Sequence, residues 1–381
     1  MKLIFVSNIL NHHQIKLCEE FQRIYDEFYF VATEDSKGIG YQKVQEANYV
    51  IPYYDNEWKQ EAVAQILSAD VVIFGGCPDD LIKVRMDVNK LSFLYSERIF
   101  KKGIWRSLIP STRKAVMNRI GQYKNSKMYV LCASAYLSYD LSFLGFPVDK
   151  CFKWGYFPET IEYVNIQMLK DYGKTQILWV GRLLGWKHPE LAVALAERLM
   201  KDGYEFELNI IGDGDQKERL EGEIKRKKLS SVVNMIGSKS SAEVRNYMEK
   251  AHVFISTSGF YEGWGAVLNE AMNSACAVVA SHSAGSTPYL VEDNINGLIF
   301  ESENIEDLYK KVKMLLDNEE KQKRIAKAAY ESIRDTWNAK VAVERFRKLT
   351  EVLLAEEKNV LLYKEGPCSR AEIIKNSWYK Q

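Results

Sequence analysis

The segment 252–275 carries the residues whose types and spacing are best suited to chemistry. An apolar run predicts a strand, which is followed by a glycine-containing loop and then by a helical pattern. Gly263 and Gly265 let the backbone approach a ligand closely, and amides at the start of a helix attract an anion. Glu262 precedes this helix and Glu270 lies within it, so each carboxylate can accept hydrogen bonds from a different part of one ligand. A helix cap and a solvated glutamate are the alternative, but the strand, loop and helix context favours a site.

A second group of candidate residues follows the apolar run 176–180. Arg182 offers a planar fork and Lys187 a point charge, and both suit a diphosphate. The string is not a phosphate-binding P-loop, because Trp186 stands where that motif needs a glycine. Two surface cations at a loop remain the alternative interpretation.

Two turns follow the next apolar runs. Gly212 and Asp213 come after 206–211, and Gly237 and Ser238 come after 232–236. The first turn resembles a dinucleotide fingerprint but lacks its third glycine. Asp213 also begins a D-x-D string, which we interpret as turn chemistry and a helix cap more often than as a metal site. We therefore predict no metal site.

These loops are positioned by alternating strand and helix patterns, which predict an α/β fold with two Rossmann-like, doubly wound domains. In such sheets, ligands bind beyond the carboxyl ends of the strands. We expect an N-terminal domain over 1–160, a C-terminal domain over 161–340 and a helical tail over 341–381 that packs on the N-terminal domain. The predicted strands are 2–6, 28–32, 70–74, 91–95, 128–132 and 151–154, then 176–180, 206–211, 232–236, 253–257, 276–280 and 297–300. The predicted helices are 14–24, 57–67, 188–201, 215–228, 241–250, 266–274, 304–317 and 339–356.

Composition excludes several classes of protein. The 52 Lys and Arg residues nearly balance 51 Asp and Glu, so the formal net charge is +1 and no global field steers the chain to nucleic acid. The six cysteines form no C-x-x-C pair, which indicates reduced thiols rather than a disulfide scaffold or a zinc site. The first residues suit a strand better than a signal peptide, and no apolar run is long enough to span a membrane. We expect a cytoplasmic protein.

Residues 176–300 resemble the C-terminal domain of GT-B-fold glycosyltransferases of glycosyltransferase family 4. The strings that carry this resemblance are ILWVGRLLGWKHPELAVALAERL, LNIIGDGD, VNMIGSKSSAEVRNYMEKAHVFISTS, EGWGAVLNEAM and VASHSAGSTPYLVEDNINGLIF. The resemblance implies a retaining, metal-independent enzyme whose two domains face each other across a cleft and close around a UDP- or GDP-linked sugar. No other cofactor is implied.

The resemblance also implies roles for individual residues. Glu262 would bind hydroxyls of the donor sugar and Glu270 the ribose, while the turns at Gly212, Asp213, Gly237 and Ser238 would line the nucleobase. The donor diphosphate would be held by side chains and loop amides at Arg182, Lys187, Gly263, Trp264, Gly265 and Ala266.

The N-terminal half departs from the family pattern. Many relatives carry two glycines after the first strand, where this chain has His12 and His13, and a histidine after a later strand, where it has Glu97. All three residues follow predicted strands and are candidate catalytic groups. A helix start at the histidines and a surface position for Glu97 are the alternatives.

The span 98–139 contains nine cations and no Asp or Glu, with apolar side chains between the cations. Within it, residues 98–127 suit an anionic membrane surface or a diphosphate-linked lipid acceptor, with a solvated basic face as the alternative.

Together these patterns predict a hexosyltransferase that moves a sugar to a glycan or polyprenyl-diphosphate-linked glycan in surface polysaccharide or glycoconjugate synthesis. We expect it to be cytoplasmic, with peripheral contact to the inner face of the cell membrane. No carboxylate is a convincing nucleophile, so we favour attack on the same face as the departing phosphate. A nucleotide-sugar epimerase on the same fold and a non-catalytic nucleotide-sugar-binding partner of another transferase are the alternatives.

Overall fold

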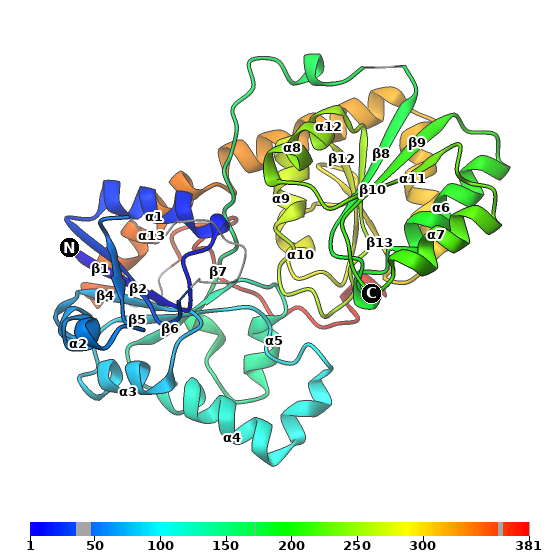
Figure 1. Cartoon of the computed structure of the whole chain (residues 1–381). Helices are drawn as coiled ribbons and strands as arrows, with labels where there is room; N and C mark the ends of the chain where they lie inside the picture. Colours follow the sequence, from blue (N-terminus) through cyan, green and yellow to red (C-terminus); the bar gives the residue numbers. More distant parts are fainter. Residues whose placement is uncertain (36–46, 172, 357–360, 381) are drawn as a thin grey trace. The chain divides into compact units, whose positions relative to one another are not determined.

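The computed structural model describes residues 1–35, 47–171, 173–356 and 361–380, and it divides the chain into two compact units (Figure 1). The first unit comprises Met1–Glu159 and Trp337–Lys375. The second comprises Thr160–Thr336 and Asn376–Gln381. Each unit is built on one parallel sheet with its own core, so each is described by itself.

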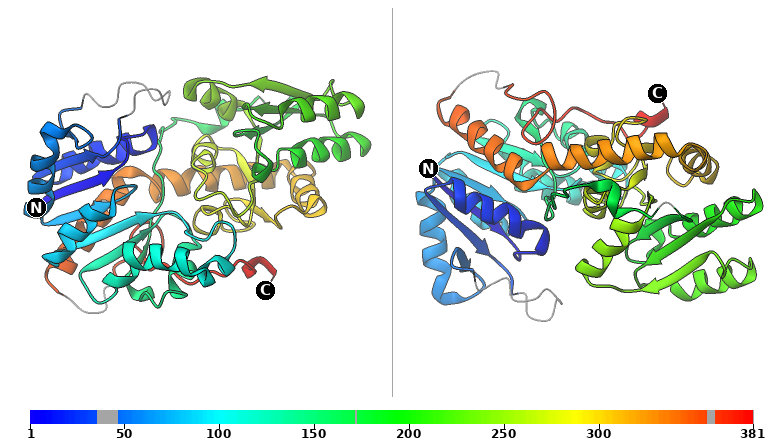
Figure 2. Two further views of the ribbon diagram at one scale, coloured as in Figure 1. Left: turned by 60° about the horizontal axis from the view of Figure 1, so that its bottom comes forward. Right: turned by 90° about the horizontal axis from the view of Figure 1, so that it is seen from above.

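The first unit contains a parallel sheet in the order β3-β2-β1-β4-β5-β6-β7. Its strands are β1 (Lys2–Ser7), β2 (Glu27–Ala32), β3 (Val50–Pro52), β4 (Val71–Phe74), β5 (Ser92–Ser96), β6 (Met128–Cys132) and β7 (Cys151–Lys153). Its helices are α1 (His12–Ile24), α2 (Lys59–Ser68), α3 (Asp79–Asp87), α4 (Pro110–Arg119), α5 (Leu137–Ser142) and α13 (Ala339–Leu354). Helix α13 lies beside α1, where the rings of Phe21 and Phe346 meet edge to face with centroids 5.8 Å apart (Figure 2).

The second unit contains a parallel sheet in the order β10-β9-β8-β11-β12-β13. Its strands are β8 (Thr175–Val180), β9 (Phe206–Ile211), β10 (Val233–Gly237), β11 (Val253–Ser256), β12 (Ala277–Ser281) and β13 (Leu298–Phe300). Its helices are α6 (Glu190–Lys201), α7 (Lys217–Arg226), α8 (Ser241–Lys250), α9 (Val267–Asn273), α10 (Thr287–Leu290), α11 (Ile305–Leu316) and α12 (Glu319–Asp335). Both sheets order their strands outward from the first strand of the unit, which is the doubly wound arrangement.

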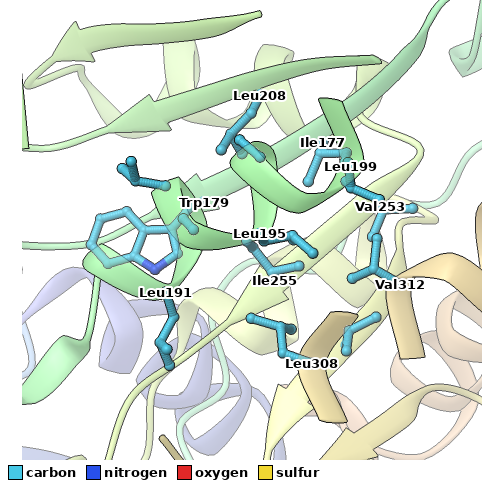
Figure 3. Close-up of a cluster of buried hydrophobic side chains, with 14 of the residues drawn as sticks. Ile177, Trp179, Leu191, Leu195, Leu199, Leu208, Val253, Ile255, Leu308 and Val312 are labelled. Carbon is cyan, nitrogen blue, oxygen red and sulfur yellow. The ribbon is translucent and has the colours of Figure 1, made fainter. Parts of the chain in front are cut away.

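The core of the second unit lies between the sheet and helices α6 and α11 (Figure 3). Leu191, Leu195 and Leu199 line one stripe of α6 because they recur every four residues, one turn apart. They meet alternate residues of the strands, such as Ile177 and Trp179 of β8. Side chains alternate between the two faces of a strand, so every second strand residue points to this face. The spacing of the apolar residues in the sequence agrees with this packing.

The prediction of an α/β fold with two Rossmann-like units is confirmed, and most predicted element bounds differ from the observed ones by one to three residues. Six observed strands and α-helices were not among the predicted ranges: β3, α3, α4, α5, α10 and α12. Strand β3 ends in Pro52, and a proline within a short apolar run argues against a strand. Helix α12 is rich in charge, and its apolar stripe packs against α9 and β12 only in the folded unit.

Two further expectations can be compared with the structure. None of the six cysteines is in a disulfide, and five of them are buried. Among the described residues, no helix combines the length and the apolar character needed to cross a bilayer.

Candidate functional site

The loops after β8, β9 and β10 are joined to one another by backbone hydrogen bonds. The amide of Gly181 donates to the carbonyl of Ile211 (3.0 Å), and the amide of Gly212 donates to the carbonyl of Gly237 (3.0 Å). The amide of Leu183 donates to the carbonyl of Asp213 (2.8 Å). Because β10, β9 and β8 are neighbours in the sheet, these loops meet at its carboxyl edge, where the sequence predicted a site.

Two glycines make this close approach possible. Gly212 has φ +143°, and a Cβ placed on it would lie 1.9 Å from the carbonyl oxygen of Gly181. Gly214 has φ +154°, and its Cβ would lie 2.6 Å from the carbonyl oxygen of Leu183. Gly237 also has a positive φ of +78°, but no atom lies within 4 Å of its Cβ position. The first two glycines are therefore required by loop packing, a role that is independent of any nucleobase.

Glu262 and Lys187 form an ion pair although they are 75 residues apart in the sequence. Both side chains are largely buried, with exposed fractions of 12% and 13%. The hydroxyl of Ser258 donates to the same carboxylate (3.1 Å). Gly265 has φ +90°, and its Cβ would lie 3.2 Å from Cγ of Glu262, so the glycine leaves room for this carboxylate.

Lys187 is positioned by the strand that it follows. Its carbonyl accepts from the hydroxyl of Thr257 (2.6 Å), and that hydroxyl accepts from the indole of Trp179 (2.8 Å). The ammonium of Lys187 also lies 4.7 Å from the ring centroid of Trp186. Arg182 is exposed and forms no ion pair with any residue that the structure describes. One cation is therefore already paired, and the other is open to an anion.

Glu270 lies in α9 and contrasts with Glu262. Burial raises the pKa of its carboxyl group, and the nearby Arg245 opposes this only in part. The guanidinium of Arg245 donates instead to the backbone carbonyl of Glu270 (3.2 Å) and to the Asn273 side chain (3.0 Å). Within the described part of the chain, the Glu270 carboxylate accepts no hydrogen bond, so it can accept hydroxyl groups of a ligand.

The remaining predicted residues at this edge of the sheet differ in their exposure and in their contacts. Asp213 is exposed and pairs with Lys217 (3.0 Å), and its other oxygen accepts from the amide of Gly214 (2.8 Å). Ser238 is exposed, and Gly263 and Ala266 are buried. The side chain of Trp264 is fully buried, with its indole donating to Asn269 (2.9 Å), so only its backbone can face a ligand. No cluster of three metal-ligating side chains occurs among the described residues.

The first unit has a polar cavity of about 360 Å³ at the carboxyl ends of β1, β4 and β5. Glu97 lies in its wall. Its carboxylate accepts from the hydroxyl of Tyr156 (2.6 Å) and from the ammonium of Lys101 (2.5 Å). The guanidinium of Arg119 donates to the carbonyls of Gly75 (2.8 Å) and Cys77 (2.9 Å) in the same region.

The two candidate histidines begin α1, which Asn11 caps. Their rings are 3.7 Å apart between centroids, and the ring of His13 stacks on Tyr156 at 6.0 Å. Burial, reinforced by the neighbouring His12, lowers the pKa of His13 to about 3. The imidazole of His13 is therefore neutral at physiological pH. The His13 ring does not line the cavity, but it stacks on Tyr156, which does.

The structure adds residues that the sequence argument did not select. Lys101, Arg119 and Tyr156 line the cavity of the first unit. The string Gly75-Gly76 after β4 was a signal that could have located this cavity, because paired glycines after a strand mark close approach. In the second unit, His188 has φ +50°, and its ring contacts Glu190 (2.9 Å) beside the Lys187 loop.

Comparison with known proteins identifies the segment that holds most of these residues. The family model described as glycosyl transferases group 1 matches residues 165–332. This segment is similar to a group 1 glycosyltransferase domain. Residues Arg182, Lys187, Glu262 and Glu270 all lie within it.

Two curated relatives are similar to part of the chain. The amylovoran biosynthesis glycosyltransferase AmsK of Erwinia amylovora is 30% identical over 47% of the chain and 44% of its own length. The N-acetylgalactosamine-N,N'-diacetylbacillosaminyl-diphospho-undecaprenol 4-alpha-N-acetylgalactosaminyltransferase of Campylobacter jejuni is 30% identical over 43% of the chain and 44% of its own length. The chain thus matches less than half the length of each of these relatives.

The fold of the chain is similar to that of a protein solved with bound UDP. HepE from Anabaena, solved in complex with UDP, superposes with a TM-score of 0.70 and covers 93% of this chain and 100% of its own. The sequences are 14% identical, so this likeness concerns the fold. Together with the two parallel sheets, it gives the chain the GT-B fold.

Proposed function

We propose that this protein is a retaining, metal-independent glycosyltransferase of family 4 that uses a UDP- or GDP-linked sugar. One observation carries the proposal. In the group 1 domain, the Lys187–Glu262 pair and the open cation of Arg182 lie at the carboxyl edge of the sheet. This combination offers cations to a diphosphate and a carboxylate to the hydroxyl groups of the sugar attached to it.

The donor roles follow from these contacts. Arg182 and Lys187 hold the diphosphate together with the amides of Gly263 to Ala266. Glu262 accepts hydroxyls of the sugar, and Glu270 accepts ribose hydroxyls. The loops at Gly212, Asp213, Gly237 and Ser238 border the nucleobase. Lys187 is paired with Glu262 before a donor binds. When the donor binds, this ion pair is exchanged for contacts of Lys187 with the phosphate and of Glu262 with the sugar.

For the transfer step, the cations stabilise the negative charge that develops on the departing diphosphate. The bond between the sugar and the phosphate breaks, and the acceptor hydroxyl attacks the sugar on the face that the phosphate leaves. Its proton passes to the departing phosphate oxygen, and the anomeric configuration is retained. We assign the acceptor to the polar cavity of the first unit. Its glutamate, Glu97, is positioned by Tyr156 and Lys101 to accept a hydrogen bond from an acceptor hydroxyl.

We assign a glycan or polyprenyl-diphosphate-linked glycan as the acceptor, in surface polysaccharide or glycoconjugate synthesis. The names of the two relatives support this assignment, since one acts in amylovoran biosynthesis and the other on a diphospho-undecaprenol-linked sugar. The epimerase and the non-catalytic partner are not favoured, because both of these relatives are transferases by name.

The decisive experiment measures UDP and GDP binding by calorimetry in three variants. Arg182→Ala should weaken nucleotide diphosphate binding about 10-fold, since a charge-assisted hydrogen bond contributes roughly 1.5–3 kcal/mol. Lys187→Ala should weaken it more, because it also leaves Glu262 unpaired beside the phosphates. Lys225→Ala removes an exposed cation of α7 and serves as the matched control. Unchanged affinity in both test variants would place the diphosphate elsewhere.

Metal independence is tested on transfer itself. Activity with a donor and a lipid-linked acceptor should persist in EDTA, because Arg182, Lys187 and the loop amides supply the charge that a metal would otherwise supply. Loss of transfer in EDTA that magnesium or manganese restores would refute this part. The anomeric configuration of the product, read by NMR, tests retention separately.

We also propose that the basic segment of the first unit rests on an anionic membrane as a peripheral contact on the cytoplasmic side. Trp105 and Leu108 are 56% and 79% exposed beside the exposed Lys102 and Lys114. Arg98 does not belong to this surface, because it is buried in an ion pair with Asp140 (3.1 Å). Cations around an exposed indole suit a lipid interface.

Sedimentation with anionic vesicles tests this contact. Binding should occur at low salt and weaken as salt rises, since exposed charges are screened over about 8 Å at physiological ionic strength. The double variant Lys102→Gln with Lys114→Gln should lose vesicle binding and keep UDP affinity. Vesicle binding that is absent at every salt concentration would favour the solvated basic face instead.

A further inference from the structure

One face of the sheet in the second unit is unusually polar. Parallel strands that are covered on both faces are ordinarily apolar throughout. Here, Ile177, Leu208 and their neighbours face the core on one side (Figure 3). The alternate positions on the other side of β8, β9 and β10 carry polar side chains. These are Gln176, Glu207, Asn209 and Asn234.

The strand register brings these four side chains together. Gln176 pairs with Glu207 across β8 and β9, and Asn209 pairs with Asn234 across β9 and β10. Each of Gln176, Glu207 and Asn234 is the second residue of its strand. The polar group therefore lies toward the amino ends of the strands, whereas Arg182 and the Gly212 turn follow their carboxyl ends.

A cavity of about 710 Å³ opens over this polar face, within the range of roughly 300–1,000 Å³ that is usual for ligand sites. Its walls come from the segment before β8, including Met168, and from α8, including Tyr247. Leu178 and Ile236 add apolar patches to its floor. Every residue that lines the cavity belongs to the second unit.

Hydrogen bonds fix the polar side chains in place. The amide of Gln176 donates to Glu207 (3.1 Å) and accepts from Asn209 (3.2 Å). The amide of Asn234 donates to Glu207 and to the side-chain oxygen of Asn209 (3.1 Å). Each Glu207 oxygen thus accepts one hydrogen bond from this network. A carboxylate offers about four acceptor sites, so the network is oriented but not saturated.

We propose that this cavity is a second saccharide site that binds a neutral glycan chain away from the donor loops. Hydroxyl groups both donate and accept, so they match a floor of one carboxylate and three amides. Tyr247, Leu178 and Ile236 offer apolar surface to the C–H face of a sugar ring. Lys170, Lys174 and Lys250 line the cavity together with Asp171, so charges of both signs occur there. At the floor itself the only charged group is the Glu207 carboxylate, which favours an uncharged hydroxyl over a phosphate. The site would hold the acceptor or product chain.

The test uses the full-length protein and a panel of neutral oligosaccharides of glucose, galactose, mannose, rhamnose and N-acetylhexosamines. At least one should bind and shift the side-chain amide NMR signals of Gln176, Asn209 and Asn234. Asn234→Ala and Tyr247→Ala should each weaken that binding at least 10-fold, with the UDP affinity and the unfolding midpoint retained. Glu221→Gln, on the exposed surface of α7, is the matched control.

Three results would overturn the proposal. They are no binding by any member of the panel, binding that both variants retain, and binding that UDP displaces. A failure of the second site can be distinguished from a failure of the proposed transfer reaction. UDP affinity measured on the same variants reports on the loops after β8, β9 and β10, which we propose bind the donor. Retained UDP binding with no oligosaccharide binding rejects the second site and leaves the transferase proposal intact.

Discussion

The donor loops of the second unit and the polar cavity of the first unit are built by different means. The donor loops are joined by backbone hydrogen bonds from Gly181, Leu183 and Gly212, with glycines where side chains would collide. In the first unit, the cavity is shaped mainly by side-chain contacts, such as those of Glu97 with Lys101 and Tyr156.

This difference explains why one region has a recognisable sequence and the other does not. A loop held by backbone hydrogen bonds allows only certain residue types at fixed positions. Its glycines and their spacing are therefore recognisable in the sequence. Side chains that meet from β5, the segment after β7 and α4 can be exchanged for other pairs that give a similar cavity. The match to the family model accordingly lies in the second unit, at residues 165–332. The predictions below test this contrast.

The largest effect is expected from Gly212→Ala. Its Cβ would lie 1.9 Å from the carbonyl oxygen of Gly181, so the loops after β8 and β9 must separate. We expect a loss of about 3 kcal/mol in the free energy of unfolding of the second unit, together with loss of UDP binding. Hydrogen exchange of the β8–β10 amides in urea measures the first effect, and calorimetry measures the second.

Gly237→Ala is the matched control for this prediction. Gly237 also has a positive φ, but its Cβ position is empty, so only the backbone strain of about 1–2 kcal/mol applies. Equal losses in the two variants would mean that strain, rather than loop packing, explains the glycine pattern.

The second prediction separates the two glutamates of the second unit. Glu262→Ala should lower kcat about 100-fold, near 2.7 kcal/mol, because its partner hydroxyls are on the transferred sugar. UDP affinity should stay unchanged or rise, since the substitution releases Lys187 from its ion pair. Steady-state kinetics and calorimetry measure these two quantities.

Glu270→Ala should instead weaken the binding of UDP and of the donor by a similar factor of about 10, because both contain ribose. Normal turnover by Glu262→Ala would reduce that residue to a structural partner of Lys187. A selective loss of donor binding in Glu270→Ala would exchange the two assignments.

The third prediction concerns the first unit. Glu97→Gln keeps the size of the side chain but removes the charge that Lys101 and Tyr156 hold in place. The acceptor KM should rise or kcat should fall by about 10-fold, while UDP affinity is unchanged. Glu34→Gln in the same unit is the control. Wild-type kinetics in Glu97→Gln would remove this cavity from the acceptor assignment.

The fourth prediction concerns His13 and affects stability rather than transfer. Its folded-state pKa, about 3, is below the ordinary value of 6.5, so below pH 6.5 the unfolded chain binds a proton that the folded chain does not. Stability is therefore lost as the pH falls from 6.5 toward 3, by at most about 1.4 kcal/mol per pH unit from this group. His13→Phe should reduce the pH dependence of urea unfolding between pH 7 and pH 5. An unchanged slope would show that His13 titrates normally.

The accuracy of the sequence-based prediction differs between elements of the structure. Strands β8 to β12 were predicted closely, because continuous apolar runs mark strands that are covered by helices. Arg182, Lys187, Glu262 and Glu270 were selected as candidates from their places after strands and within a motif, and their roles remain predictions. Strand β3 was missed because it ends in Pro52, and a proline argues against a strand in so short a run. Lys101, Arg119 and Tyr156 were missed because no local pattern connects residues that come from separate loops.

The sequence by itself determined the α/β class, the two doubly wound sheets and the glycine-rich edge of the second unit. These features depend on the period of apolar residues and on backbone conformations that few residue types allow. Only the tertiary structure decided which charges are paired. It joined Lys187 to Glu262, buried Arg98 against Asp140 and placed Gln176, Glu207, Asn209 and Asn234 on one face. Such partners are distant in sequence, and the strand order brings them together.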